Sequence, residues 1–552
     1  MAKGDAANTV ELLHNRREML RLLALTPVAV ACAPDAKPAS ADAAASDSAR
    51  GSPDGSTPDS SSADVPTAEV PTAEVTAEVA PAPCTKVGAN AAISHGPISG
   101  GSTATSVRLA VRLSGPAKVQ FRLLAKGGGA PIDSECGLAQ ESDDFSVVVL
   151  ATGLVAATEY AVTPIIDDAA IPERAIYTRT FSPAGTSTEF SFVFGSCCRY
   201  DDQGTASTTM GKTFELVEKL PEKPWFFAQA GDWTYPDYAF VKQVGKDANG
   251  NNYTVFPAEI AKAWRRKLTD KYPIRKVLAA MPLAHIWDDH DFAENNAHQA
   301  VTGSQSARMA AFRRYLPAFD LPGGDLGAWQ RFSVGHCDFF LVDMRSQRTD
   351  VKAAILKEKQ ADGTFKYSLK EPAGHTMLGQ TQLKWLIEGL KTSKALWKIV
   401  ILPVEINPRY DVLMQESLKL GIGLLIEAIG DSWSGYPSER TQLLDLHTSG
   451  AVKNMVFLTG DAHMGAMAQR DASCPPIFMS ANLDIDQAPI MDFLVQFNID
   501  PKPIWPQWFQ DSTGENTIGR VRVVTAPSQQ LVFEAWGHSG QVLHSMTVPA
   551  QI

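Results

Sequence analysis

From residue 190 onward, short apolar runs alternate with longer stretches in which apolar residues recur every three or four positions. In the stretch 379–393, Leu383, Leu386, Ile387 and Leu390 follow the i, i+3, i+4, i+7 spacing of a helix with one face toward a core. Strands that are apolar throughout and alternate with helices predict an α/β fold with a largely buried sheet. The predicted strands are 190–196, 224–232, 283–289, 398–404 and 454–461.

A different pattern precedes this region. Between residues 84 and 185, short runs rich in Val, Leu and Phe alternate apolar with polar positions and are separated by Gly, Pro and Asp. The rhythm predicts a small antiparallel β-sandwich, so we divide the folded part into domains at 84–185 and 190–552. Cys84 and Cys136 lie in the first domain, and both a disulfide and two unpaired thiols are compatible with the sequence.

The N-terminus has the pattern of an export signal. In NRREMLRLLALTPVAVAC (15–32), paired arginines precede an apolar run that is shorter than the ~20 residues needed to cross a bilayer. We predict that residues 1–32 form a twin-arginine signal, read by the twin-arginine export machinery. AVAC at 29–32 resembles a loose lipobox, which would anchor Cys32 to the membrane through lipid, although Ala29 stands where a larger aliphatic residue is usual. The alternatives are release of the chain, and a buried amphipathic helix, for which a polar face is lacking.

Residues 33–83 consist mostly of Ala, Ser, Asp, Pro and Thr, and VPTAEVPTAEVTAEVAPAP (65–83) repeats itself. Such a segment has too little apolar surface to offset its ordering entropy, which predicts a disordered acidic linker between anchor and domain. We therefore expect an exported protein that lies in the periplasm or on the cell surface. It would be tethered to the membrane if Cys32 carries lipid.

Charge and cysteine content narrow the classes of function. The 552-residue chain has a net charge of -11 and no run of Lys and Arg, which argues against a nucleic-acid binder. Its seven cysteines are too few for a disulfide scaffold and odd in number, so at least one is unpaired. Cys337 and Cys474 are predicted to be inert buried thiols.

Side chains that bind metals follow four of the predicted strands, at the carboxyl ends where open α/β sheets bind ligands. A single Asp at a strand end is usually a helix cap, but several carboxylates that converge without a cation would repel one another severely. Thiolate, imidazole and the nearby Tyr235 phenolate suit a transition metal, whereas carboxylates suit a hard cation. Two metals with Asp232 as their bridge are therefore predicted. The strand-end residues are Cys197, Asp232, Asp288, Asp289, His290, Asp461 and His463.

Seven ordered motifs, spread over roughly residues 85 to 550, resemble those of the alkaline phosphatase D (PhoD-like) family. They are GSC (195–197), GDWTYPD (231–237), WDDHDF (287–292) with Asn295 and Asn296, VDMRSQR (342–348), LGQTQLKWL (378–386), W-x-x-Y-x-x-E-R (433–440) and FLTGDAH (457–463).

The resemblance implies a calcineurin-like metallophosphatase fold, a sandwich of sheets with helices, preceded by the small β-sandwich. It also implies a phosphatase with ferric iron and calcium that cleaves phosphate monoesters or diesters through a metal-activated hydroxide. Iron would be held by Cys197, Asp232, Tyr235 and His463. Calcium would be held by Asp232, Asp289 and Asp461, with Asp288, Asn295 and Asn296 as further candidates.

Three further side chains are candidates for catalysis. His290 stands where related metallophosphatases keep an acid or an orienting group. Arg345 and Arg348 offer planar forks that match phosphate, and an ion pair that supports their loop is an equally good interpretation.

Two departures from the family pattern affect the site. Cys198 and Arg199 follow Cys197 where glutamine is common, and Glu405 follows a strand after which many metallophosphatases supply histidine. Cys198 is expected only to fill space. The competing hypothesis for the whole chain is a tethered surface module that binds a partner and holds metal for structural reasons.

Overall fold

The computed structural model describes residues 84–199, 211–235, 245–246, 252–253, 258–301, 305–485, 494, 499–510 and 515–551. The predicted signal (1–32) and linker (33–83) lie outside these residues and stay predictions. Cys84–Ile552 is a compact unit, and none of its described helices is long and apolar enough to cross a membrane.

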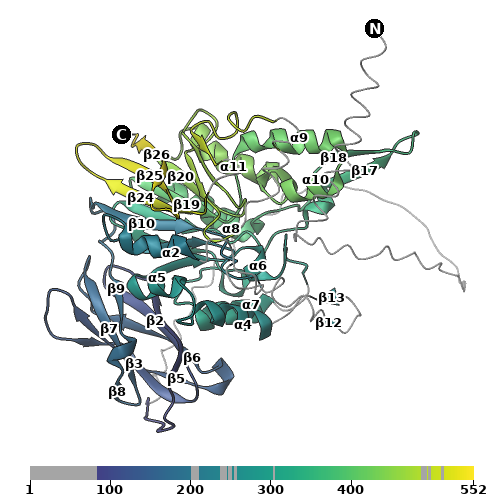
Figure 1. Cartoon of the computed structure of the whole chain (residues 1–552). Coiled ribbons are helices and arrows are strands. Elements are labelled where there is room, and N and C mark those ends of the chain that lie inside the picture. The colour runs from purple at the N-terminus through teal and green to yellow at the C-terminus, as the bar shows by residue number, and fades with distance from the viewer. Residues whose placement is uncertain are drawn as a thin grey trace, which may run out of the picture. The chain divides into compact units, whose positions relative to one another are not determined.

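The first large sheet has nine strands, and three of the five predicted strands lie at its centre (Figure 1). Neighbours among β10, β11 and β14 run parallel, which brings their carboxyl ends to the same edge. The order is β26 (Val542–Pro549), β25 (Gln530–Gly537), β24 (Thr517–Val524), β10 (Phe190–Gly195), β11 (Phe227–Ala230), β14 (Leu283–Ile286), β1 (Ile93–Gly100), β2 (Ser106–Leu113) and β6 (Ser146–Thr152).

The other two predicted strands, β19 and β20, belong to a second, seven-stranded sheet. Its order is β15 (Gln330–Val334), β16 (Cys337–Leu341), β19 (Trp397–Leu402), β20 (Met455–Thr459), β22 (Ile477–Ser480), β21 (Gly465–Ala468) and β23 (Trp508–Phe509).

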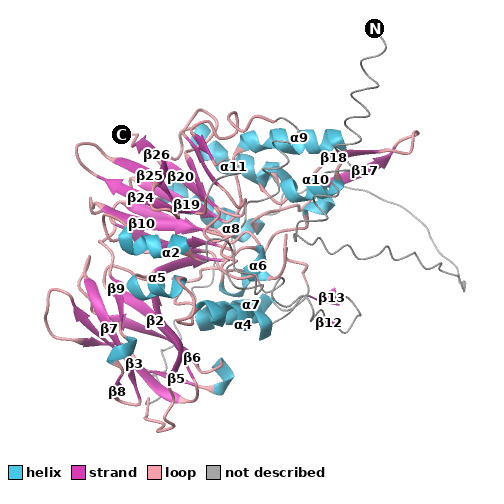
Figure 2. Cartoon of the chain, in the orientation of Figure 1, coloured by secondary structure: helices cyan, strands magenta, loops and turns pink. Residues whose placement is uncertain are grey.

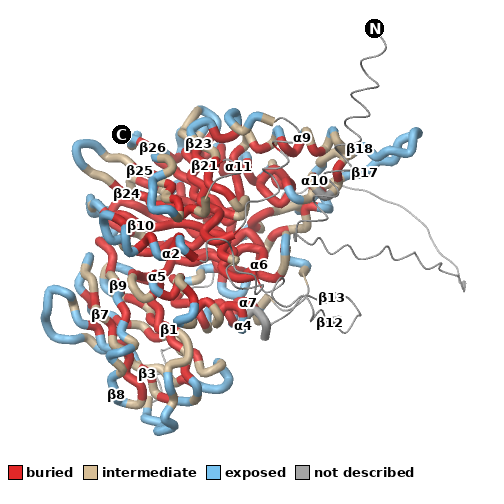
Figure 3. Tube along the Cα trace, viewed as in Figure 1, coloured by how far each residue is buried: buried red, intermediate tan, exposed pale blue. Residues whose placement is uncertain are grey.

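The two large sheets share one core. Phe192 of β10 stacks on Phe226 with ring centroids 4.8 Å apart, and both rings meet Phe339 of β16 edge-on at 5.3 Å. Each of these rings is fully buried, and the buried tube of Figure 3 runs through both sheets. Two facing sheets confirm the predicted sandwich architecture.

A smaller antiparallel sheet packs on the β1–β2–β6 end of the first sheet. It contains β3 (Ala117–Ala125), β4 (Ile132–Asp133), β5 (Gly137–Ala139), β7 (Glu159–Ile166), β8 (Ala169–Ala170) and β9 (Ile176–Arg179). Inward residues of β2 and β3, such as Leu109 and Phe121, share a core, and Cys84 and Cys136 form a disulfide with a Cα–Cα distance of 6.0 Å.

The predicted β-sandwich is therefore present, and its β1 also pairs with β14 through Gly100 and Leu283. The division into domains at 84–185 and 190–552 stays a prediction.

Helices cover the outer faces of the sheets (Figure 2). The predicted helix is present as α8 (Gly379–Thr392), with Leu383, Leu386 and Leu390 buried and Ile387 half-buried. The other α-helices of the described residues are α2 (Lys212–Leu216), α4 (Ala258–Lys267), α5 (Ile274–Ala280), α6 (Asp289–Phe292), α7 (Gln305–Tyr315), α9 (Asp411–Leu420), α10 (Gly423–Gly430) and α11 (Pro437–Thr448). Two hairpins stand apart from the large sheets. They are formed by β12 (Gly245–Lys246) with β13 (Asn252–Tyr253) and by β17 (Ile355–Lys359) with β18 (Phe365–Leu369).

Candidate metal centre

The strand ends of both large sheets bring seven of the predicted ligand residues together. In each of three overlapping groups the candidate ligand atoms lie within 4.8 Å of one another, and Asp232 belongs to all three. The position of Asp232 is therefore that of a bridging ligand. The groups are Cys197, Asp232 and His463; Asp232, Asp289 and His290; and Asp232, Asp288, Asp289 and Asp461.

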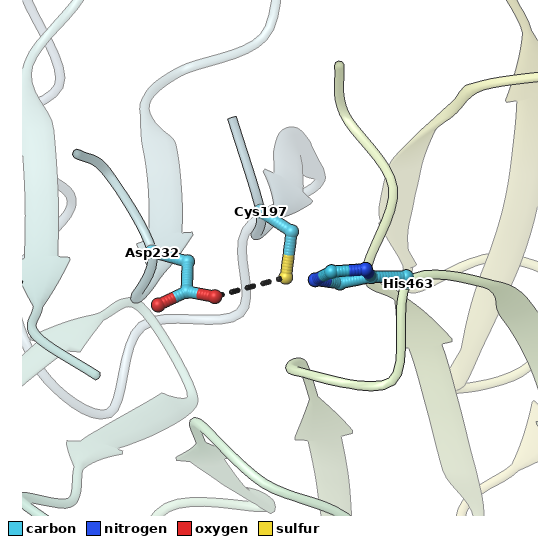
Figure 4. A group of neighbouring side chains, drawn as sticks. All are labelled: Cys197, Asp232 and His463. Atoms are coloured by element: carbon cyan, nitrogen blue, oxygen red, sulfur yellow. Dashed lines mark hydrogen bonds between the residues drawn. The ribbon is translucent and has the colours of Figure 1, made fainter. Parts of the chain in front are cut away.

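The first of these groups joins the two sheets. Figure 4 shows the Cys197 thiol between the Asp232 carboxylate and the His463 ring. The Cys197 Sγ lies 3.6 Å from Asp232 Oδ2, and the Cys197 N–H donates to the Gly231 carbonyl at 3.3 Å. At Gly460, which precedes Asp461, a Cβ would lie 2.6 Å from the Ser196 Oγ, so a glycine is needed for this close approach.

Four of the candidate ligands have left-handed backbone conformations. Their φ values are 61° at Cys197, 55° at Asp232, 65° at Asp461 and 50° at His463. Such a conformation costs a non-glycine residue on the order of 1 kcal/mol or more, and it persists where the surrounding structure imposes it. Strained backbone of this kind recurs at functional sites, and these four residues follow β10, β11 and β20.

Two buried carboxylate oxygens face the cluster without a hydrogen-bond partner among the described residues. Asp232 Oδ2 accepts from the Tyr235 hydroxyl at 2.8 Å, but Asp232 Oδ1 has no such partner. Asp288 Oδ1 accepts from Arg345 Nε, and Asp288 Oδ2 also lacks a partner. Buried oxygens of this kind are costly in isolation, and a cation would satisfy both.

Burial, together with charge repulsion, raises the pKa of most acids in the cluster. Burial and then the Asp289 carboxylate raise the pKa of Asp232 well above its usual range. Burial and then Asp288 and Asp289 do the same to the pKa of Asp461, and burial raises the pKa of Asp288 to about 7. A bound cation would reverse this cost by stabilising the charged forms.

Burial also disfavours the charged forms of the candidate nitrogen and sulfur ligands. Burial, followed by the Asp232 and Asp461 charges, raises the pKa of the Cys197 thiol well above its usual range, while burial lowers the pKa of His463 to about 3. The imidazole is therefore in its neutral, ligand-competent form, and a thiolate at Cys197 requires a compensating cation.

His290 and Tyr235 lie beside the shared Asp232. Their ring centroids are 4.3 Å apart, and both residues are buried. Burial and the adjacent Asp232 carboxylate raise the pKa of the Tyr235 hydroxyl well above its usual range. The Tyr235 hydroxyl is therefore protonated and donates to Asp232 in the metal-free cluster.

Asp291 is a buried carboxylate whose role was not predicted, although it lies inside WDDHDF. It accepts hydrogen bonds from the backbone N–H groups of Trp233, at 3.1 Å, and Thr234, at 2.8 Å. It also accepts from the Asp288 N–H and completes a capping box at the start of α6. The Asp-x-x-Asp spacing at 288–291, which resembles that of a capping box, could have predicted this role.

Arg345 and Arg348 lie in a buried ion-pair network. The Arg345 guanidinium donates to Asp288 through Nε and to both carboxylate oxygens of Asp431, at 3.1 and 3.0 Å. Arg348 lies 2.7 Å from Asp431 and donates through Nε to the Tyr436 hydroxyl at 2.9 Å. These contacts match the interpretation that the two arginines form ion pairs that support their loop. A contact of either arginine with phosphate stays a prediction.

The two asparagines lie on the turn that follows α6. The Asn296 backbone N–H donates to Asp289 Oδ2 at 2.6 Å, with φ at 58°, and Asn295 is exposed. Although burial opposes the shift, Arg345, His290 and this N–H hold the pKa of Asp289 below its usual range. A calcium contact of Asn295 or Asn296 stays a prediction.

Cys198 and Glu405 mark the two departures from the family pattern. Cys198 is buried in the core, where Lys267 Nζ donates to its carbonyl at 2.8 Å and lies 3.9 Å from its Sγ. Glu405 is buried, which raises its pKa to about 7, and it belongs to none of the three ligand groups among the described residues.

Comparison with solved structures supports the fold. The chain resembles a structure described as "Structure of PhoD", with a TM-score of 0.58 and 19% identity over 84% of this chain and 94% of that one. It also resembles purple acid phosphatase PPD1 from yellow lupin seeds, with a TM-score of 0.54 and 11% identity over 82% and 74% of the two chains. The chain therefore shares the fold of these two phosphatases, and the predicted calcineurin-like fold, a sandwich of sheets with helices, is confirmed.

Residues 192–485, more than half of the chain, match the family model described as PhoD-like phosphatase. The chain belongs to the PhoD-like phosphatase family. A curated relative, alkaline phosphatase D of Bacillus subtilis (strain 168), is 26% identical over 304 residues, which span 51% of this chain and about half (47%) of the relative. The predicted family is confirmed, and membership supports a phosphoesterase, while the role of each site residue stays a prediction.

Proposed function

We propose that this protein is an exported, metal-dependent phosphoesterase that hydrolyses phosphate monoesters, diesters or both. The observation that carries the proposal is the set of three ligand groups that share Asp232, in which all residues are buried except the half-buried Asp461 and His463. A cluster of this charge is unfavourable when empty, and bound cations would offset both its charge and that of a phosphate ester.

The donor types suggest which metal each side would hold. Ferric iron fits the thiol, phenol, imidazole and carboxylate of Cys197, Tyr235, His463 and Asp232. Calcium fits the carboxylates of Asp289 and Asp461 with Asp232 as the bridge, and Asp288, Asn295 and Asn296 are further oxygen donors. When bound, such a metal pair supplies Lewis acidity and an activated water nucleophile for attack on phosphorus.

The protein's own side chains would orient and protonate the reacting groups. His290 lies in the same ligand group as Asp232 and Asp289, and it would donate a proton to the leaving oxygen. Arg345 would act as a positioning residue, because its Nε holds Asp288 at the edge of the cluster.

Export is supported by the cysteine chemistry of the folded unit. The Cys84–Cys136 disulfide suits an oxidising compartment. A twin-arginine signal carries proteins that have already folded, so Cys197 would enter that compartment buried and bound to metal. Lipid on Cys32 would tether the protein to the membrane.

Hydrolysis of chromogenic phosphate esters tests the proposal. The purified protein is expected to cleave a monoester or a diester, to lose at least about tenfold in rate on chelation, and to recover with iron and calcium. Metal-loaded, folded protein that cleaves neither ester would favour the surface binding module instead.

The two adjacent cysteines give a test of the iron assignment. Cys197→Ser is expected to lower iron affinity by about 100-fold or more, because a direct ligand is removed, and to remove the visible charge-transfer band of an iron-bound phenolate. Cys198→Ser makes the same sulfur-to-oxygen change at the neighbouring core residue, and it is expected to keep both the iron affinity and the absorption band. Iron content and absorption spectra are the measurements, and equal iron in the two variants would contradict the assignment.

A further inference from the structure

The turn that carries Asp232 is held by a buried side chain that belongs to none of the three ligand groups. Gln229 lies on β11, two positions before Gly231. Its Oε1 accepts from the Gly231 N–H at 3.0 Å, and its Nε2 donates to the Gly231 carbonyl at 2.6 Å. One side chain therefore binds both backbone polar groups of the residue that precedes Asp232.

Gly231 lies against two other strand ends of the cluster. Its φ is 89°, and a Cβ at this position would lie 2.4 Å from the Asp288 Cβ, so only glycine fits. Its carbonyl, which accepts from Gln229, also accepts from the Cys197 N–H at 3.3 Å. A shift of Gly231 would therefore change the spacing between the candidate ligands Cys197 and Asp232.

Asp232 needs support on both sides because its φ of 55° is left-handed. Such a conformation persists at a non-glycine residue only where the surrounding structure imposes it. On the side that follows Asp232, the Asp291 carboxylate accepts from the N–H groups of Trp233 and Thr234 at 3.1 and 2.8 Å. Gln229 holds the side that precedes Asp232.

His285 fixes the orientation of the Gln229 amide. The two residues are paired on the parallel strands β11 and β14, and the His285 Nδ1 lies 2.6 Å from the Gln229 Oε1. Because an amide oxygen can only accept, the His285 Nδ1 donates. Burial lowers the pKa of His285 to about 3, so the neutral ring holds the amide without adding charge beside the cluster.

We propose that Gln229, oriented by His285, is a positioning residue for the bridging ligand Asp232. It fixes the backbone from which the Asp232 carboxylate reaches both metal sides. Without this hold, Asp232 can relax toward an ordinary φ, which moves its carboxylate relative to the other ligands. The inference rests on the metal-dependent function proposed above, because it assigns Asp232 to both metals.

Gln229→Met tests the inference without changing the charge of the cluster. Methionine has a similar shape, but it cannot donate to the Gly231 carbonyl and its thioether is only a weak acceptor. Ser134→Ala is the control, because the buried Ser134 Oγ accepts from the Phe121 N–H at 3.0 Å in the small antiparallel sheet. Both variants weaken a side-chain bond to one buried backbone N–H, and only Gln229→Met does so beside the cluster.

Iron affinity, measured by competition with a chelator, is expected to fall about 10–100-fold in Gln229→Met and to stay unchanged in Ser134→Ala. The visible charge-transfer band of an iron-bound phenolate should shift or weaken in Gln229→Met alone. In the metal-free protein, hydrogen exchange at residues 231–234 should be faster in Gln229→Met than in the wild type. Wild-type iron affinity in Gln229→Met, or unchanged exchange at this turn, would overturn the inference.

His285→Phe tests whether the histidine acts through Gln229. Phenylalanine can keep the stacking on Phe312, whose ring centroid lies 5.8 Å away, but it cannot donate to Gln229. We expect His285→Phe to lower iron affinity less than Gln229→Met does, and the double variant to match Gln229→Met. Additive losses would overturn the orienting role of His285.

Ester hydrolysis measured on the same proteins separates this inference from the proposed function. A wild type that binds iron and cleaves no ester would refute the phosphoesterase, while the comparison of iron affinities would still decide the role of Gln229. A wild type that binds no metal would overturn both. An active wild type with equal iron affinity in Gln229→Met would overturn the positioning role alone.

Discussion

Asp232→Asn is expected to abolish phosphate ester hydrolysis and to stabilise the metal-free protein. Asp232 belongs to all three ligand groups, so the neutral amide weakens both metal sides at once. Loss of even an outer partner of a metal ligand costs 10–100-fold, so the loss here should exceed about 100-fold in kcat/KM. Without metal, however, the same change removes a buried charge from a cluster of like charges, which raises the melting temperature.

The pH dependence of the stability of the metal-free protein tests the repulsion within the cluster independently. The pKa values of Asp232, Asp461 and Asp288 lie above those of an unfolded chain, so the folded state binds more protons. Stability should therefore fall as pH rises from about 4, the unfolded carboxyl value, through about 7, the pKa of Asp288. In Asp232→Asn this fall should be shallower.

Asp362→Asn is the matched control for Asp232→Asn, because Asp362 is exposed on the turn between β17 and β18. It should leave activity unchanged and should not reproduce the shallower fall of stability above pH 4, because its carboxylate interacts with Thr364 and not with the cluster. Wild-type hydrolysis by Asp232→Asn would show that the cluster is not the catalytic centre.

Local patterns account for what the sequence predicted well. The five apolar strands and the apolar face of α8 are periodic over a few residues, and each strand and the helix is present. The residues of the cluster could be predicted to lie together because most of them directly follow such a strand, as Cys197 follows β10 and Asp461 follows β20.

Pairing between distant segments could not be predicted in this way. Nothing in the local pattern places β10, β11 and β14 in one sheet and β19 and β20 in another. Likewise, β1 pairs with β14 only through Gly100 and Leu283, which are 183 positions apart in the sequence.

The arginine network shows the same limit at the site. A planar fork suits a phosphate and a carboxylate equally, so the sequence left the roles of Arg345 and Arg348 open. Asp431, which binds both, follows the helix α10 rather than a strand and lies 86 positions from Arg345. Its importance depends on burial and on contacts that only the fold creates.

Asp431→Ala is expected to lower the free energy of unfolding by about 3–5 kcal/mol, since it leaves buried guanidinium charge uncompensated. Arg345 and Arg348 are 0% and 1% exposed, and Asp431 accepts from both. Asp411→Ala is the comparison: Asp411 pairs with Arg440, whose side chain is 7% exposed, but the Asp411 carboxylate itself is 37% exposed, so water reaches the place of the lost contact. Its cost should be smaller than that of Asp431→Ala.

Urea unfolding of metal-loaded protein measures both variants. Because Arg345 also donates to Asp288, the loss of Asp431 should reach the metal cluster, and metal content should fall in Asp431→Ala but not in Asp411→Ala. Arg348→Met in the Asp431→Ala background removes one of the stranded charges without unpairing Asp288, and it should restore part of the stability, because the charge rather than the cavity dominates the cost. Equal destabilisation by Asp431→Ala and Asp411→Ala would instead mean that Asp431 is solvated in the folded protein and that the arginines do not depend on it.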